Sequence, residues 1–91
     1  MPRHFVYILE CVDGSLYTGY TTDPERRFRE HSSGRGSRYT RARLPLKLSY
    51  VEERRSRNDA LRREIQIKRM GRREKQSLCG KPWKREGYSR R

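Results

Sequence analysis

The stretch FVYILECVDGSLYTGYT, residues 5–21, decides the fold of this chain. Its first part, Phe5 to Val12, is an apolar run broken only by Glu10, and a run without alternation predicts a central strand with both faces buried. Asp13-Gly14 is a strong turn signal, and Leu16 to Thr21 is expected to return as a second, antiparallel strand. The chain is therefore predicted to begin with a β-hairpin.

The length of the hairpin loop decides whether Tyr7 and Tyr17 share a face of the sheet. A two-residue loop made of Asp13-Gly14 would put the two tyrosines on opposite faces. A three-residue loop that includes Ser15 would pair Cys11 with Tyr17 and put both tyrosines on one face. A site built from both side chains therefore requires the longer loop or a bulge.

A helix is predicted directly after the hairpin. Asp23-Pro24-Glu25 has the composition of a helix start, with a capping carboxylate, a proline at the first helical position and an acid in the first turn. Phe28 is the only large apolar residue of this helix, so we expect it to dock on the sheet. Arg27 and His31 lie one turn apart and flank Phe28. They are either a solvated basic stripe or part of a site.

The middle of the chain predicts a long loop and a third strand. Residues 33–45 combine turn residues and arginines with Tyr39, a composition that suits a phosphate backbone and an unstacked base. A loop without function is the alternative. The alternating run Leu46 to Val51 predicts a strand, which the acidic pair Glu52-Glu53 is expected to end. The residues expected on one side of this strand are Leu44, Leu46, Leu48 and Tyr50.

A carboxylate interrupts the apolar face of the next predicted helix, which Ser56 or Asn58 caps and for which Gly71 offers a left-handed stop. Burying Glu64 there without a partner would cost several kcal/mol, so it must be paired or hold a cation. An ion pair with Lys68 at i+4 is one interpretation. A divalent cation, completed by waters and substrate phosphates, is the other. The apolar face is formed by Ala60, Leu61, Ile65 and Ile67.

The composition indicates a polyanionic partner. The chain has 24 Lys and Arg against 11 Asp and Glu, a formal charge of +13 in 91 residues. Nucleic acid is the commonest reason for such a charge, and an anionic membrane surface or a disordered basic tail is a less favoured alternative. No apolar run reaches the roughly 20 residues of a membrane span, and no secretory signal is recognisable, so we expect a cytoplasmic protein. The spacing of Cys11 and Cys79 predicts two reduced thiols, one of them buried.

Together these motifs resemble the GIY-YIG nucleases. Phe5-Val6-Tyr7 stands at the place of the first tripeptide and Tyr17-Thr18-Gly19 at the place of the second. The run Arg38-Tyr39-Thr40-Arg41 resembles the small stand-alone bacterial branch of that superfamily (YhbQ-like). The resemblance implies an α+β fold in which helices flank a three-stranded antiparallel sheet. It also implies one nuclease-like domain, residues 1–80, and we expect a basic, flexible tail at 81–91, preceded by a short helix from Arg72 to Cys79.

The resemblance implies a metal-dependent DNA endonuclease. Glu64 would hold one Mg²⁺ or Mn²⁺ ion, and Arg27 would stabilise charge on the phosphate. Tyr17 would deprotonate the attacking water with Tyr7 in support, and His31, with an ordinary pKa of about 6.5, is the rival base. No small-molecule cofactor is expected. The residues expected to contact nucleic acid are Gly19, Tyr20, Arg35, Arg38, Tyr39, Arg41, Arg43 and Lys68.

Two alternatives to this function remain open. The first is a DNA- or RNA-binding module that keeps the nuclease fold without catalysis, which the composition supports equally well. The second is an adaptor that uses its basic surface to bind an acidic protein. Phe5 and Tyr20 depart from the motifs, because Phe5 replaces a glycine and Tyr20 stands where some relatives have a lysine. The resemblance implies a role in DNA repair, recombination or nucleic-acid turnover; whether RNA is also a ligand and what the oligomeric state is do not follow from the sequence.

Overall fold

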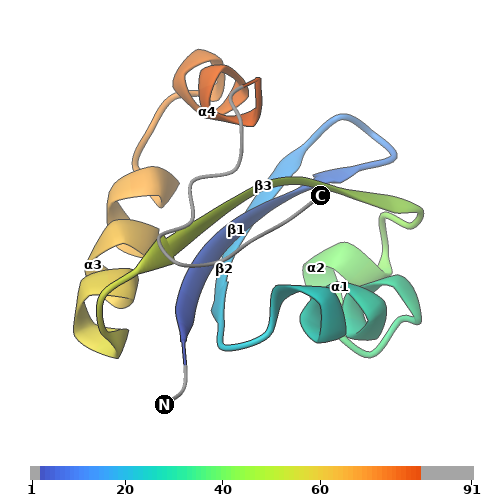
Figure 1. The fold of residues 1–91 in the computed structure, drawn as a ribbon. Helices are drawn as coiled ribbons and strands as arrows, with labels where there is room; N and C mark the ends of the chain where they lie inside the picture. Colours follow the sequence, from blue (N-terminus) through green and yellow to red (C-terminus); the bar gives the residue numbers. More distant parts are fainter. Residues whose placement is uncertain (1–2, 81–91) are drawn as a thin grey trace.

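The computed structural model describes residues 3–80, so the predicted tail, with Trp83 and Tyr88, lies outside the described residues. Three antiparallel strands form one sheet in the order β2-β1-β3, and helices lie on both of its faces (Figure 1). The prediction of an α+β fold with a three-stranded antiparallel sheet is therefore confirmed. The elements are β1 (His4–Cys11), β2 (Leu16–Thr21), α1 (Pro24–Ser32), α2 (Arg38–Arg41), β3 (Leu46–Arg54), α3 (Arg57–Lys68) and α4 (Arg72–Cys79).

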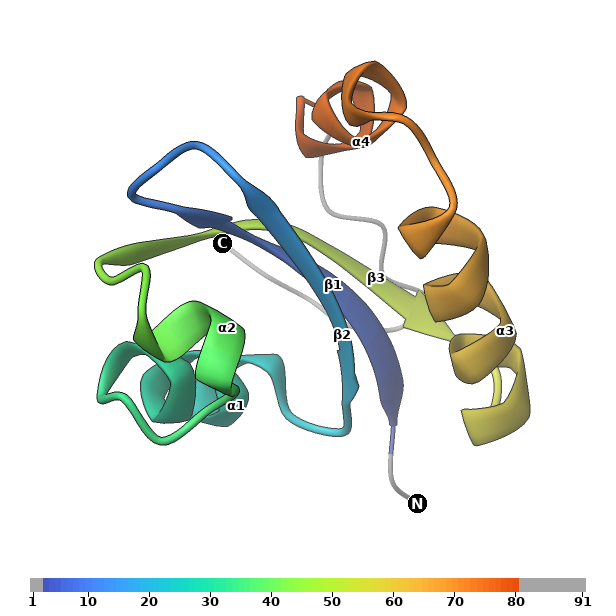
Figure 2. The ribbon, with the colours of Figure 1, turned by 180° about the vertical axis from the view of Figure 1, so that it is seen from behind.

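The central strand β1 is buried on both sides, as its unbroken apolar run predicts. Helices α1 and α2 lie on one side of the sheet, and α3 and α4 lie on the other (Figure 2). We call these sides the α1 face and the α3 face. The α1 face buries Phe5, Tyr7, Leu9 and Val51 with Phe28 packed against them, and the α3 face buries Val6, Ile8, Tyr50, Ala60 and Ile67.

The hairpin loop has three residues, but not the three that the sequence suggested. The amide of Cys11 donates to the carbonyl of Ser15 at 2.8 Å, so residues 12–14 form the loop, and Gly14 has the positive φ of 85° that such a loop requires. Tyr17 is therefore opposite Leu9, and the predicted pairing of Cys11 with Tyr17 is wrong. The shift amounts to two residues, which leaves every side chain on the same face.

Strand β3 contains a β-bulge that the alternating pattern did not predict. Leu48 is opposite Leu9, whereas Tyr50 is opposite the next residue of β1, Ile8, so Ser49 is the extra residue. Leu48 consequently packs on the α1 face and Tyr50 on the α3 face. The prediction that these two residues lie on one side was wrong.

Strand β3 also continues through the acidic pair Glu52-Glu53, which was expected to end it. The buried carboxylate of Glu52 accepts a hydrogen bond from the hydroxyl of Tyr50 at 2.8 Å. It also forms ion pairs with Arg54 and, at 3.1 Å, with Arg63 of α3. A buried carboxylate with this many partners can remain in a strand, because its oxygens are satisfied.

The segment between α1 and β3 is more ordered than predicted. Residues 33–45 were expected to form an irregular loop, but they contain the short helix α2. The hydroxyl of Ser37 caps α2 by accepting the amide of Thr40 at 3.1 Å. At the other predicted helix, Ser56 caps α3 as expected, whereas Gly71 has a φ of −71° and is the N-cap of α4 instead of a left-handed stop.

Helix α3 turns charged side chains as well as apolar ones toward the sheet. Ala60 and Ile67 are fully buried, but Ile65 is 51% exposed, so its predicted place on the buried stripe was wrong. Arg63 and Glu64 lie between the buried residues at i+3 and i+4, and their side chains are only 18% and 17% exposed. The stripe thus supplies ionic groups to the body of the domain.

Two further predictions concern the thiols and the membrane. Cys11 is buried, Cys79 is half-buried, and both are free, as predicted. Among residues 3–80, no helix has the length and apolar character that crossing a bilayer requires.

Candidate active site

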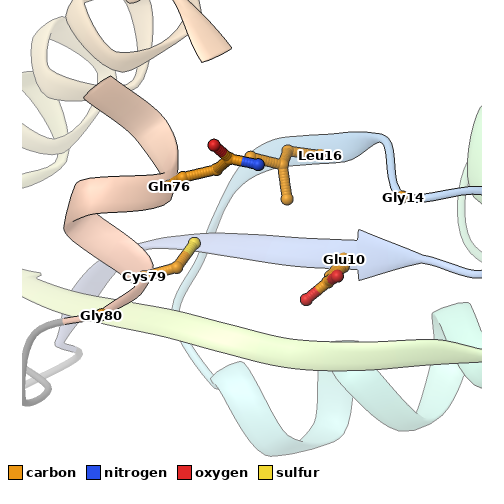
Figure 3. A pocket seen from close by; sticks show the side chains of 6 residues that line it. All are labelled: Glu10, Gly14, Leu16, Gln76, Cys79 and Gly80. Atoms are coloured by element: carbon orange, nitrogen blue, oxygen red, sulfur yellow. The ribbon is translucent and has the colours of Figure 1, made fainter. Parts of the chain in front are cut away.

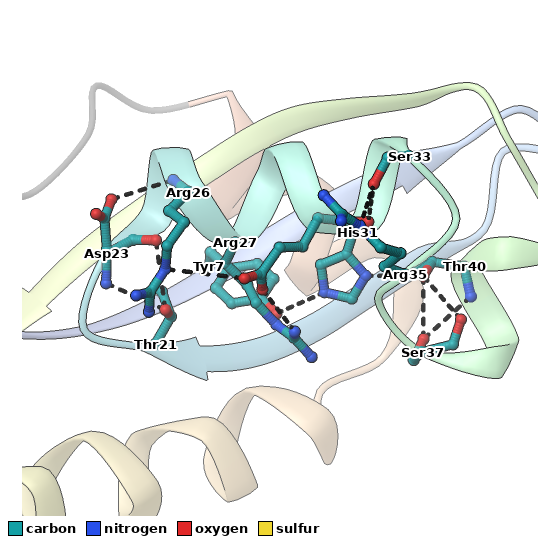
Figure 4. Close-up of polar contacts among 11 residues, drawn as sticks. Tyr7, Thr21, Asp23, Arg26, Arg27, His31, Ser33, Arg35, Ser37 and Thr40 are labelled. Atoms are coloured by element: carbon teal, nitrogen blue, oxygen red, sulfur yellow. Dashed lines mark hydrogen bonds and ion pairs between the residues drawn. The ribbon is translucent and has the colours of Figure 1, made fainter.

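The rings of Tyr7, Tyr17 and His31 form a cluster on the α1 face (Figure 4 shows Tyr7 and His31). The centroids of Tyr17 and His31 are 5.3 Å apart, those of Tyr7 and His31 are 5.9 Å apart, and those of the two tyrosines are 6.5 Å apart. Strands β1 and β2 and helix α1 each contribute one ring. The structure therefore brings together three of the residues that the sequence singled out.

The start of α1 explains why His31 reaches this cluster. Asp23 caps the helix by accepting the amide of Arg26 at 3.1 Å, and Pro24 occupies the first helical position, as predicted. Phe28 packs on the sheet. His31 follows three residues later on the same side of the helix, so it also points toward the sheet. His31 is fully buried, so the interpretation of this side of α1 as a solvated stripe is wrong for His31.

A chain of hydrogen bonds runs from Tyr7 through His31 to helix α2. The Tyr7 hydroxyl is 2.9 Å from Nε2 of His31, and Nδ1 of His31 is 2.8 Å from the hydroxyl of Thr40 (Figure 4). That hydroxyl in turn donates to the carbonyl of Ser37 at 3.2 Å. The sequence predicted no role for Thr40 or Ser37, although their i, i+3 spacing is the spacing of a helix cap.

Two glycines allow this cluster to pack. A Cβ on Gly19 of β2 would lie 2.4 Å from the Tyr7 hydroxyl, and a Cβ on Gly36 would lie 2.0 Å from Nδ1 of His31. Neither distance is compatible with a side chain larger than hydrogen. Gly19 was expected to contact nucleic acid, but in this structure its immediate neighbour is Tyr7.

Burial shifts the pKa values of two groups in the cluster. Desolvation, with smaller contributions from Tyr17 and Glu64 and against the opposing effect of Arg27, raises the pKa of Tyr7 to about 12. Desolvation also lowers the pKa of His31, and the Arg27 guanidinium adds to that effect. Near neutral pH, therefore, Tyr7 is a phenol and His31 is a neutral imidazole.

Arg27 lies beside the Tyr7 hydroxyl and is a third exposed. Its guanidinium donates to the carboxylate of Glu30 at 2.9 Å, which leaves further N–H groups of the fork for an anion. A phosphate close to Tyr7 could therefore be contacted by a cation that the helix already holds in place.

Glu64 comes from the opposite side of the sheet. Helix α3 packs on the α3 face against β1 and β2, yet the charge of Glu64 acts on Tyr7 and raises its pKa. One oxygen of Glu64 pairs with Nζ of Lys68 at 3.2 Å, and among the described residues the other oxygen has no hydrogen-bond partner. The acid thus has the i+4 partner of the first interpretation from the sequence, whereas the bound cation of the second stays a prediction.

The donor set around Glu64 can be compared with the needs of a divalent ion. No group of three or more His, Cys, Asp or Glu side chains suited to a metal is found within residues 3–80. Mg²⁺ requires only one or two carboxylates when waters and substrate phosphates complete its shell. The Lys68 side chain is 54% exposed and can leave Glu64 without disturbing the core. Glu64 therefore fits a cation bound together with a phosphate.

The residues expected to bind nucleic acid fall into three groups. Arg35, Arg38 and Arg41 are exposed around α2. Tyr39 stacks on Tyr17 at 6.0 Å, and the Arg43 guanidinium lies 3.8 Å from the centre of the Tyr39 ring. Tyr20 packs on the α3 face with its hydroxyl 2.9 Å from Nδ1 of His4, away from the cluster, and Lys68 is the partner of Glu64.

A separate pocket lies at the hairpin end of the sheet, beside α4. Its volume is about 300 Å³, and Figure 3 shows Glu10 and Cys79 among its lining side chains. Desolvation raises the pKa of the Cys79 thiol, with the Glu10 charge adding to the effect, so this thiol is a poor nucleophile. The pocket contains none of the residues of the Tyr7–His31 cluster, and we assign it no catalytic role.

The fold and the cluster define a GIY-YIG domain. The sequence model described as the GIY-YIG catalytic domain matches residues 3–77, so the chain belongs to this family. Its relatives include UPF0213 protein HQ_3675A of Haloquadratum walsbyi, 56% identical over 76 residues that cover 84% of this chain and 85% of the relative. UPF0213 protein BH0048 of Halalkalibacterium halodurans is 50% identical over 76 residues, which cover 84% of this chain and 81% of the relative.

Solved structures from the same group share the fold. The solution structure of UPF0213 protein BH0048 from Bacillus halodurans aligns with a TM-score of 0.55 at 49% identity and covers 86% of this chain and 83% of that one. The solution structure of EF2693 from E. faecalis aligns with a TM-score of 0.59 at 40% identity, and the alignment covers 85% of this chain and 82% of that one. The resemblance drawn from the sequence motifs is therefore confirmed. The relatives' names state no substrate or activity.

Proposed function

We propose that this protein is a metal-dependent DNA endonuclease that hydrolyses phosphodiester bonds, with a role in repair, recombination or turnover of nucleic acid. The observation that carries the proposal is the convergence of Tyr7, Tyr17 and His31 with the Arg27 guanidinium on one face of the sheet. Acidic, basic and cationic groups are the equipment of general acid-base and electrostatic catalysis at a phosphate. Family membership supports a nucleic-acid substrate in general terms.

In the proposed reaction, Tyr17 loses its own proton to solvent and then, as a phenolate, takes the proton from the attacking water. Tyr17 is only partly covered by its neighbours, whereas His31 is fully buried with both ring nitrogens in hydrogen bonds. A general base must reach the water directly or through one intermediary. His31 therefore acts behind Tyr7 and not on the water itself, which favours Tyr17 over His31 as the base.

Arg27 stabilises the charge that develops on the phosphate, and Tyr7 supports the geometry of the site. The guanidinium contributes donors that strengthen their bonds as charge builds on the non-bridging oxygens. Tyr7 remains protonated because its pKa is raised to about 12, so it orients neighbouring groups as a neutral hydroxyl. The dry environment of the cluster strengthens each of these interactions.

Glu64 would hold one Mg²⁺ or Mn²⁺ ion. For this the Lys68 ammonium would have to give up its ion pair with the Glu64 carboxylate. Nucleases of this family generally use a divalent metal. Such an ion supplies Lewis-acid stabilisation to the scissile phosphate and its leaving oxygen.

The proposal is tested by plasmid nicking. The protein is incubated with supercoiled plasmid and Mg²⁺, and nicking is compared between wild type and Glu64→Gln. We expect the variant to lose at least about 100-fold in rate, because loss of a catalytic electrostatic group typically costs that much. Binding of the same DNA at low salt, measured by fluorescence anisotropy, should persist.

A matched control removes an acid of α4 instead. Glu74 of α4 accepts the amide of Gly71 at 2.9 Å, and Glu74→Gln keeps an oxygen for that bond while removing the charge. This variant should nick like wild type. If wild type fails to nick over a broad range of metals and salt concentrations but still binds DNA, the non-catalytic module is the better description.

A further inference from the structure

The hydrogen-bond chain behind Tyr7 assigns a positioning role to Thr40, a residue that is fully buried and contacts the Nδ1 side of the His31 ring. We infer that the Thr40 hydroxyl holds His31 in the tautomer that carries its proton on Nδ1, so that Nε2 must accept the proton of the Tyr7 hydroxyl. This inference rests on the proposed function for its catalytic meaning only. The tautomer itself can be observed in the absence of any activity.

The direction of the chain follows from counting protons. The Thr40 hydroxyl has one hydrogen, and it donates to the carbonyl of Ser37, which can only accept. If the Thr40 hydrogen is used in this way, the 2.8 Å bond between His31 and Thr40 is donated by Nδ1–H of the ring. A neutral imidazole has one N–H, so Nε2 carries a lone pair, and the 2.9 Å bond to Tyr7 is donated by the phenol. The Ser37 hydroxyl, 3.1 Å from the Thr40 hydroxyl, would also allow the reverse direction, so the Tyr7 end of the chain decides between the two.

The opposite tautomer would leave a buried proton without an acceptor. Arg27 lies beside the Tyr7 hydroxyl and has only donors, so it needs a lone pair of that oxygen. If Nε2 of His31 also donated to the same oxygen, the Tyr7 hydrogen would have no partner among these groups. An unsatisfied buried donor costs about 1–3 kcal/mol. The Nδ1–H form satisfies all the groups of the chain at once.

The local backbone is built to deliver the Thr40 hydroxyl. Ser37 caps α2, a helix of only four residues, and fixes Thr40 through its amide. Gly36 lets this segment approach the imidazole so closely that a Cβ would lie 2.0 Å from Nδ1. Thr40 is therefore the residue through which α2 controls the polarity of the Tyr7–His31 pair.

The test reads the tautomer directly by NMR. In protein labelled with ¹⁵N in histidine, two-dimensional spectra that correlate ring protons with ring nitrogens distinguish a protonated from an unprotonated nitrogen. The chain has two histidines, and His4 lies on the α3 face with its own partner, Tyr20, so it serves as an internal reference. Wild type should show His31 protonated on Nδ1 alone.

Three variants separate the partners of the ring. Thr40→Val removes the acceptor at constant shape, and we expect His31 to move its proton to Nε2, where the Tyr7 oxygen can accept it. Thr40→Ser should keep the wild-type tautomer. Tyr7→Phe removes the other partner and should also keep the proton on Nδ1. If Thr40→Val does not fold, as judged by thermal unfolding, Thr40→Ala provides the same test without the added methyl group.

The catalytic consequence is measured separately. In the nicking assay, Thr40→Val should lower kcat at least about tenfold with little change in KM, and Thr40→Ser should restore it. An unchanged Nδ1–H tautomer in Thr40→Val and Thr40→Ala would overturn the inference. A tautomer that changes as expected in a protein that never nicks DNA would leave the inference intact and count against the proposed function alone.

Discussion

At the scale of single residues, the positions of the Tyr7 and His31 rings depend on neighbouring glycines as well as on hydrogen bonds. His31 is fully buried, and Gly36 lies against its ring because it has no side chain. Gly19 has the same relation to Tyr7. These glycines are used for close approach, since neither has a positive φ. Their replacement should therefore act on the position of the rings and not on the backbone conformation.

The substitution Gly36→Ala tests this directly. A Cβ 2.0 Å from Nδ1 would force either α2 or the His31 ring to move, and overpacking of this kind typically costs about 1–3 kcal/mol. We expect a loss of that size in the free energy of unfolding, measured with urea, together with loss of the Nδ1–H signal of His31. Gly80→Ala is the control, because its nearest contacts would be 3.7 and 3.8 Å, and it should leave both readouts unchanged.

At the scale of elements, an ionic network joins β3 to α3. Glu52 of β3 is buried. Its carboxylate accepts a hydrogen bond from Tyr50 and forms ion pairs with Arg54 and with Arg63 of α3. Burial alone would raise the pKa of Glu52, but the hydrogen bonds from Tyr50 and Arg54 and the charge of Arg63 outweigh it and lower the pKa. The network attaches α3, the helix that carries Glu64, to the sheet.

The lowered pKa of Glu52 predicts a specific dependence of stability on pH. Because the folded pKa lies below the ordinary value of 4.5, the contribution of Glu52 is fully present above pH 4.5 and is lost as pH falls through the folded pKa. Glu52→Gln should lower the free energy of unfolding near neutral pH by about 1.5–3 kcal/mol, since Tyr50, Arg54 and Arg63 lose a charged hydrogen-bond acceptor. The difference from wild type should shrink in acid.

Urea unfolding at a series of pH values measures this difference. Glu10→Gln is the control, because Glu10 is an exposed carboxylate of the same sheet. It should leave the dependence of stability on pH as in wild type. A gap between Glu52→Gln and wild type that stays constant down to strongly acidic pH would contradict the assignment.

The sequence predicts those elements whose signals are local. The apolar run of β1, the cap and proline of α1 and the cap of α3 each act within a few residues, and each was recognised. The bulge at Ser49 was missed because pairing with β1 and burial on both faces override a simple alternation. The short helix α2 was missed because Thr40 packs against His31, nine residues earlier in the chain, and this contact cannot be recognised in the local sequence.

The same contrast applies to the candidate site. Tyr7, Tyr17, Arg27 and His31 stand in recognisable motifs, whereas Thr40 has no signature beyond a helix cap. Its importance depends on the fold, which brings its hydroxyl to 2.8 Å from an imidazole. Residues that act through another residue are therefore harder to find from sequence than residues that belong to a motif.

At the scale of the whole molecule, charge governs the proposed encounter with DNA. Lys and Arg residues occur in α1, α2, β3, α3 and α4 alike, so attraction to a polyanion alone does not identify the binding surface. If DNA lies on the α1 face, the exposed arginines around α2 should each release a counterion on binding. Arginines near the start of α3 should contribute less, because they lie away from the tyrosines.

Two triple variants with the same loss of charge separate these surfaces. Replacing Arg35, Arg38 and Arg41 by Gln should reduce the slope of log K against log salt by up to about 3, because each phosphate contact contributes about 0.9. Replacing Arg55, Arg57 and Arg62 by Gln removes the same charge from exposed positions at the start of α3 and should change the slope far less. Anisotropy titrations with one DNA duplex over a series of salt concentrations give both slopes. Equal slopes for the two variants would mean that DNA has no preference for the α1 face, which would contradict the proposal that the cluster on this face acts on DNA.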